Sequence, residues 1–208
     1  MPDLRGFGEA SDTPAKWSVD ESADDIEARI AAQNIERYTL IGHSMGGKIA
    51  LALAARAPKG LERLVLLTPS PPTPEPMSAD GRKRLLEGFG VRASAEETVS
   101  QITAHPLPPD LHELSVADIL RSKPGAWRAW LEVGSRENIA ARMNRIRVPV
   151  SVVAGECDSV MTPALLRREV VERLADAQLH TIPNAAHLLP LETPEAVARF
   201  IRGAFVSH

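Results

Sequence analysis

A serine framed by glycines is the residue of this chain best placed for nucleophilic chemistry. Residues 42–46 read Gly-His-Ser-Met-Gly, the pattern G-x-S-x-G. An apolar run over residues 38–41 precedes it and a helical pattern follows, which is the strand–turn–helix context that the motif requires. Such a turn holds the hydroxyl of Ser44 clear of the backbone, and we expect glycine at positions 42 and 46 because larger side chains would clash there. The alternative is a glycine-rich packing turn with an incidental serine.

The same stretch also matches the pattern of a phosphate-binding loop. Residues 42–48 spell G-x-x-x-x-G-K, after which such a loop places serine or threonine to bind magnesium. This chain has Ile49 at that position, which disfavours nucleotide binding. Lys48 is therefore expected to be a solvated helix residue.

A serine nucleophile needs a base, and the base needs an acid that orients it. Of six histidines, His187 alone follows a strand-like run and precedes a helix, so we expect it at the sheet edge that carries Ser44. Glu156 and Asp158 are the acid candidates, and we favour Asp158 because it lies further out on its loop. Ser44, Asp158 and His187 follow the chain order of one triad lineage. A surface-loop histidine is the alternative for His187.

The elements that must position these residues alternate between helices and apolar strands. Strands are expected at 38–41, 61–67, 148–154 and 179–182. Helices are expected at about 18–30, 45–57, 162–174 and 193–205, where Ser18 and Thr162 are typical N-caps. Continuous apolar strands separated by helices indicate a parallel sheet covered on both faces, an α/β fold.

The middle of the chain has a different pattern. Prolines cluster at residues 69–76, which cannot be helix or central strand, so we place a boundary there. Residues 69–146 contain short helical patterns at 81–89, 95–103, 111–120 and 124–133 and no convincing strand. We therefore expect an α/β core made of residues 1–68 and 147–208, with residues 69–146 inserted as a helical cap.

Three ring-bearing residues are further candidates for contact with a substrate. His43 lies inside the serine turn and is expected to point away from Ser44. Trp127 and Trp130 lie in the inserted helices, close in sequence to Leu131. The tryptophans either line an apolar pocket together with Phe89 or pack the insertion onto the core.

Composition narrows the function classes. The chain of 208 residues is 44% apolar and 25% charged, as in an ordinary globular protein, and its net charge of −3 argues against a nucleic-acid partner. Neither a transmembrane run nor a secretory signal is evident. With one cysteine, Cys157, and no cluster at metal-ligand spacing, we expect no metal, no cofactor and a cytoplasmic location.

Four stretches together resemble the α/β-hydrolase superfamily, specifically small bacterial esterase-like members with a helical cap. The resemblance covers essentially the whole chain and assigns the triad acid to Asp158. It implies that the backbone N–H of Met45 is one donor of the oxyanion hole. The matching stretches are residues 3–8, like the loop leaving the family's fourth strand, 42–47, the nucleophile elbow, 154–158, the acid turn, and 182–187, the base turn.

One departure from the family pattern concerns the strands before Asp3. The family has four strands there, and the loop after the third supplies the second oxyanion donor. The resemblance therefore implies that this chain lacks that donor and the N-terminal part of the sheet, which leaves residues 38–41 as an open apolar edge. A late start assignment or a fragment explains this better than a naturally minimal enzyme. Loss of one oxyanion donor typically lowers kcat by about 10²–10³.

The expected activity is serine hydrolysis of a small-molecule carboxylic ester or related acyl substrate. His187 would take the proton of Ser44, Asp158 would orient the imidazole, and water would release the acyl group. Activity should rise with pH as a histidine loses its proton, near pH 6.5 for an unperturbed ring. The resemblance disfavours dehalogenase and epoxide hydrolase chemistry, because superfamily members with those activities have aspartate at the position of Ser44. Thioester or C–C bond hydrolysis and perhydrolysis remain alternatives, as does a non-catalytic binding protein on the same fold.

Overall fold

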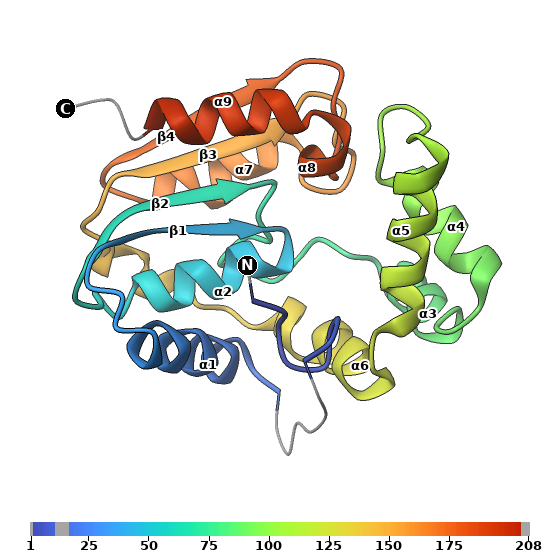
Figure 1. Cartoon of the computed structure of the whole chain (residues 1–208), viewed down its shortest axis with the longest axis horizontal. Helices are drawn as coiled ribbons and strands as arrows, with labels where there is room; N and C mark the ends of the chain where they lie inside the picture. Colours follow the sequence, from blue (N-terminus) through green and yellow to red (C-terminus); the bar gives the residue numbers. More distant parts are fainter. Residues whose placement is uncertain (1, 11–16, 205–208) are drawn as a thin grey trace.

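In the residues that the structure describes, four parallel strands form the central sheet (Figure 1). The computed structural model describes residues 2–10 and 17–204. In sheet order the strands are β1 (Tyr38–His43), β2 (Leu61–Leu67), β3 (Val150–Gly155) and β4 (Ala177–Ile182). The apolar runs predicted all four strands to within two residues at each end, and the parallel pairing confirms the predicted α/β class. Within the described residues β1 is an edge strand, with the Ile41 side chain partly exposed.

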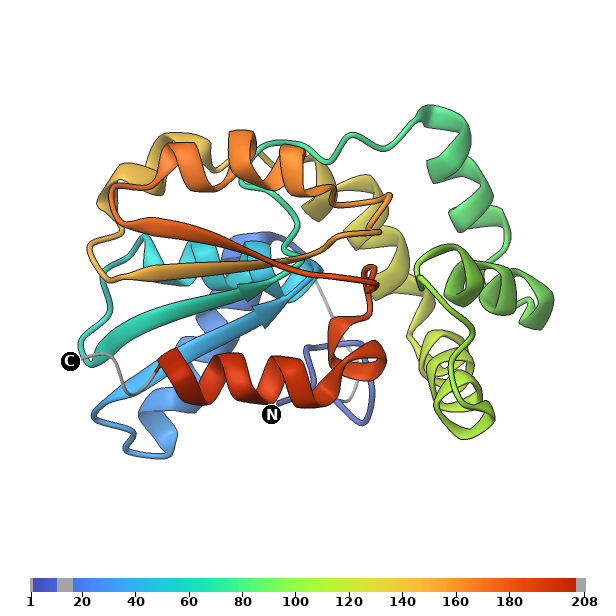
Figure 2. The same cartoon turned by 90° about the horizontal axis from the view of Figure 1, so that it is seen from above.

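Helices cover both faces of this sheet, as Figures 1 and 2 show. On one face lie α1 (Val19–Ala32), α2 (Met45–Ala54) and α7 (Pro163–Glu169), and on the other lies α9 (Pro194–Ala204). Side chains alternate between the faces along each strand. Leu64 and Leu66 therefore pack with α2 in the larger core cluster, whereas Val65 and Leu67 pack with α9.

The segment between β2 and β3 is a helical insertion, and its residues 69–146 are called the cap below. Its helices lie beyond the carboxyl ends of the strands (Figure 1), and α4 and α5 share a small apolar cluster of their own. Its elements are α3 (Ala79–Glu87), α4 (Arg92–Gln101), α5 (Pro109–Arg121), α6 (Pro124–Glu132) and the 3₁₀ turns η1 (Gly134–Arg136) and η2 (Ala140–Arg145). Across the described part of the chain, no helix is both long and apolar enough to cross a bilayer.

Two helices are shorter than their sequence patterns predict. The helix after the serine turn ends at Ala54. Ala57 then adopts a positive φ of 52°, because the following Pro58 disfavours helical backbone at Ala57. The helix opened by Thr162 ends at Glu169 and continues as the 3₁₀ turn η3 (Val171–Arg173). After β4, the described residues up to 204 form two helices, α8 (Leu189–Glu192) and α9.

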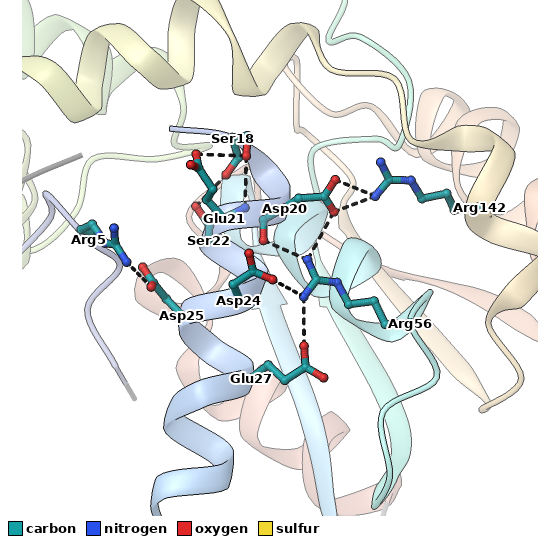
Figure 3. A network of polar contacts seen from close by, with 10 residues as sticks. All are labelled: Arg5, Ser18, Asp20, Glu21, Ser22, Asp24, Asp25, Glu27, Arg56 and Arg142. Atoms are coloured by element: carbon teal, nitrogen blue, oxygen red, sulfur yellow. Dashed lines mark hydrogen bonds and ion pairs between the residues drawn. The ribbon is translucent and has the colours of Figure 1, made fainter. Parts of the chain in front are cut away.

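A network of charged side chains fastens α1 to its neighbours (Figure 3). Arg56, just after α2, donates to Asp24 over 2.6 Å, to Glu27 over 2.9 Å and to the backbone carbonyl of Asp20 over 2.9 Å. Arg142 in η2 donates to both carboxylate oxygens of Asp20, over 2.6 and 2.8 Å. Its hydrogen bonds are the largest cause of the lowered pKa of Asp20. The network joins α1 to the end of α2 and to the chain returning from the cap.

Candidate active site

The turn between β1 and α2 places Ser44 in a strained backbone conformation, with φ of 49° and ψ of −121°. A Cβ on Gly42 would lie 2.5 Å from the carbonyl oxygen of Gly46, which confirms that glycine is required there. The same prediction for Gly46 is wrong, because a Cβ at that position would meet open space. Gly47 is the second constrained position, since its Cβ would overlap the Cβ of Pro69.

Three side chains from separate strand ends form a hydrogen-bonded chain. Ser44 Oγ lies 2.8 Å from His187 Nε2, and His187 Nδ1 lies 2.8 Å from Asp158 Oδ2. Asp158 and His187 are buried. The structure thus brings together the three residues that the sequence predicts as a triad, because the carboxyl ends of parallel strands meet at one edge of the sheet.

The buried carboxylate of Asp158 is held as an anion. Burial alone would raise its pKa, but hydrogen bonds from His187 and from two backbone N–H groups hold the pKa below its usual value. Those N–H groups belong to Val160 and Met161, at 2.8 and 2.9 Å from Oδ1. Glu156, the other acid candidate, is exposed, and its carboxylate accepts the backbone N–H of Asn184 over 3.3 Å.

His43 faces the turn that carries His187. Its Nε2 lies 2.8 Å from the carbonyl oxygen of His187, and the two ring centroids are 5.4 Å apart. Burial lowers the pKa of His43 to about 4, so the ring is neutral at neutral pH. A neutral ring with its proton on Nε2 donates this hydrogen bond.

The backbone of His187 is held from two sides, which sequence reasoning missed. Its carbonyl oxygen also accepts a hydrogen bond from Thr68 Oγ1 over 3.0 Å, at the end of β2. Its N–H donates over 3.0 Å to the carbonyl oxygen of Ile102, which follows α4 in the cap. No local pattern signals either partner, because both are far from His187 in sequence.

The first residue after Ser44 also begins a helix. Met45 opens α2, where the N–H groups of the first turn lack intrahelical acceptors. Together with the helix dipole, these groups favour negative charge at this end of α2.

A profile of the alpha/beta hydrolase family matches residues 1–200. The chain belongs to the α/β-hydrolase family. This confirms the resemblance carried by the four sequence stretches.

Relatives of this α/β hydrolase include esterases. An esterase from Thermogutta terrifontis is 27% identical, with a TM-score of 0.83 over 98% of this chain and 78% of that one. The esterase EaEST from Exiguobacterium antarcticum, 20% identical, shares the fold with a TM-score of 0.90 over 99% of this chain and 80% of its own. A 2-succinyl-6-hydroxy-2,4-cyclohexadiene-1-carboxylate synthase from Serratia proteamaculans is 28% identical over 99% of this chain and 82% of its own.

Lys48 of the hydrolase is fully buried, so the prediction of a solvated lysine is wrong. Its Nζ donates to the carbonyl oxygen of Thr73 over 3.2 Å, near the start of the cap, and to that of Ser135 over 3.5 Å, in η1. Burial lowers the pKa of Lys48 to about 8, against the opposing charges of Glu75 and Glu137. The helical period of α2 does not reveal this burial, because the residues that cover Lys48 belong to the cap and are far from it in sequence.

A cavity of about 760 Å³ lies between cap helices α3 and α4 and residues 159–161, directly after Asp158. Trp127 lines it, with Nε1 donating to the carbonyl oxygen of Leu85 over 2.9 Å and its ring 5.7 Å from that of Phe89. Trp130 instead packs against the main core.

Proposed function

We propose that this α/β hydrolase cleaves a carboxylic ester by forming an acyl-enzyme intermediate on Ser44. The observation that carries the proposal is the hydrogen-bonded chain from Ser44 Oγ through the ring of His187 to Asp158, with both distances 2.8 Å. The 27% identical esterase supports ester chemistry in particular. This nucleophile–base–acid order is the arrangement that activates a serine hydroxyl.

In the acylation step, Ser44 Oγ attacks the carbonyl carbon of the ester while His187 Nε2 takes its proton. Asp158 keeps the Nδ1 proton in place and stabilises the imidazolium that forms. The tetrahedral oxyanion develops beside the N-terminus of α2, where the N–H of Met45 donates to it. The C–O bond then breaks, and His187 returns the proton to the departing alkoxide oxygen.

In the deacylation step, a water molecule attacks the acyl carbon while His187 takes its proton. The second tetrahedral intermediate collapses, the carboxylic acid leaves, and Ser44 regains its proton from His187. A substituent of the ester that extends past Asp158 would enter the cavity lined by residues 159–161 and Trp127, whose lining does not include Ser44 or His187.

The test is the intact mass of the protein after reaction with a fluorophosphonate probe. We expect one adduct on the wild-type chain and none on Ser44→Ala, with unchanged circular dichroism. Ser100→Ala is the matched control, because Ser100 is an exposed serine of α4 outside the cavity wall and its loss should leave the adduct. No adduct on a folded wild-type chain would contradict the proposal and favour a non-catalytic binding protein.

A panel of esters with graded acyl length then tests the substrate class. Turnover that disappears in Ser44→Ala supports ester hydrolysis. A labelled Ser44 without ester turnover would contradict it and redirect the assignment to thioester, C–C bond or perhydrolysis chemistry.

A further inference from the structure

The turn that carries His187 is gathered around one carboxylate. Glu192 Oε1 accepts the backbone N–H groups of Ala186 over 3.2 Å and Leu188 over 3.0 Å, the residues on either side of His187. Oε2 also accepts the N–H of Ala186, over 3.1 Å. Hydrogen bonds to a charged acceptor are stronger than neutral ones, so this carboxylate restrains the backbone from which the imidazole projects.

The same carboxylate reaches the cap. Glu192 Oε2 accepts the backbone N–H of Ala104 over 2.7 Å, two residues after Ile102. Ile102 itself accepts the N–H of His187. Residues 102–104 of the cap therefore make two hydrogen bonds to the turn of His187 and its brace.

Apolar packing joins these two segments as well. Leu188 and Leu191 pack against the small cluster that α4 and α5 form around Val99 and Val116. The segment that contacts the turn of His187 thus belongs to the cap's own packed unit. Because packed side chains shift together rather than singly, displacement of the cap would withdraw the hydrogen-bonding groups of residues 102–104 as a set.

The bonds from the core would survive such a displacement. His43 and Thr68 hold only the carbonyl oxygen of His187, whereas the N–H partner lies in the cap. Among the described residues the carboxylate of Glu192 makes hydrogen bonds with backbone N–H groups and forms no ion pair within 4.0 Å. Its contacts are those of a brace between two chain segments.

We propose that Glu192 is a positioning residue that makes the alignment of His187 depend on the seating of the cap. This inference rests on the proposed role of His187 as the base. With the cap seated, the turn is restrained on its N–H side by Ile102 and through Glu192. With the cap displaced, the turn keeps the bonds of Glu192 to Ala186 and Leu188 but loses Ile102, and Glu192 loses Ala104, so the hydrogen bond of the ring to Ser44 loosens.

Amide hydrogen exchange tests the brace without any need for activity. Glu192→Gln keeps the size of the side chain but turns one acceptor into a donor, so that N–H groups face an N–H group. We expect amide exchange to accelerate in two peptides at once, one covering residues 184–190 and one covering residues 102–106. The acceleration should be about tenfold or more, as for loss of a charged hydrogen bond. Glu195→Gln is the matched control, because the Glu195 side chain is 90% exposed and lies on the same segment. Acceleration in one peptide only, or in neither, would overturn the coupling.

Kinetics of the folded protein distinguish positioning from mere stabilisation. Activity is normalised to the number of active sites, counted as the Ser44 residues that react with the fluorophosphonate probe. For Glu192→Gln we expect this normalised kcat to fall about 10–100-fold, with KM within about threefold, because misplacing a base by about 1 Å lowers the rate on that order. A lower melting temperature with an unchanged kcat per active site would overturn the positioning role.

A second variant isolates the cap side of the brace. Ala104→Pro removes the N–H that the cap donates to Glu192 and also fixes the backbone φ of residue 104, and its effect on kcat should be non-additive with that of Glu192→Gln. Additive effects would contradict coupling through the shared bond. If the wild-type chain failed to label at Ser44, the proposed function would fall, and the exchange experiment would still decide whether Glu192 braces the two segments.

Discussion

The ring of His43 donates a hydrogen bond from Nε2 to the backbone carbonyl oxygen of His187 over 2.8 Å. One histidine thus supports another from the core side, and its buried ring is held neutral with a pKa of about 4. His43 therefore belongs to the turn that carries Ser44 and also stabilises the turn that carries His187.

This buried ring predicts acid sensitivity. The pKa of His43 is about 4 in the folded chain against 6.5 for a free ring, so its contribution to stability is present above pH 6.5 and is lost as pH falls towards 4. The unfolding free energy of the wild-type chain should drop by about 3 kcal/mol more over this range than that of His43→Gln, which keeps a donor but does not titrate. Urea unfolding at several pH values measures the difference, and parallel curves would contradict it.

Lys48 predicts that stability also rises with pH, but in the alkaline range. Burial lowers its pKa to about 8 in the folded chain from 10.5, so the folded state binds the proton less tightly than the unfolded state. The stability of the wild-type chain relative to Lys48→Met should therefore rise between pH 8 and 10.5, by about 2–3 kcal/mol. Denaturant unfolding of both proteins checks this, and a constant difference would show that Lys48 does not carry the effect.

Neighbouring glycines should respond differently to alanine. Gly47→Ala forces a Cβ into Pro69, and overpacking of this kind typically costs about 1–3 kcal/mol. Gly46→Ala places its Cβ in open space within α2, where alanine favours the helix by about 1 kcal/mol. Thermal unfolding should rank the variants Gly46→Ala, wild type, Gly47→Ala from most to least stable. Equal losses from both alanines would contradict the expected clash at Pro69.

The two acid candidates should separate in kinetics. Asp158→Asn leaves the shape of the site but removes the charge that orients the His187 ring, and we expect kcat to fall on the order of 10³–10⁴. Glu156→Gln is the matched control, because Glu156 is exposed and contacts the backbone of Asn184. Its kcat should stay within about twofold of wild type, as for surface changes away from a site. A large loss in Glu156→Gln with activity retained in Asp158→Asn would reverse the assignment of the acid.

The local sequence pattern was sufficient to predict the parallel sheet and the proximity of Ser44, Asp158 and His187. Continuous apolar runs predict buried parallel strands, and the carboxyl ends of such strands share one edge. That rule alone brings Ser44, Asp158 and His187 into one neighbourhood. Membership of the α/β-hydrolase family could be inferred from the same residues, because the elbow and the two later turns have characteristic sequences.

The tertiary structure alone decided which side chains the cap covers and which partners hold the base. Lys48 has the sequence position of a surface lysine, yet carbonyl groups of residues 73 and 135 enclose it. Glu192 has the sequence position of a short helix end, yet it gathers N–H groups from residues 104, 186 and 188. These contacts join segments that are far apart in the chain, and periodicity describes only the face of a single element. The sequence determined the sheet and the chain order of the proposed triad. The packing of the cap against the sheet decided which groups hold the turn of His187.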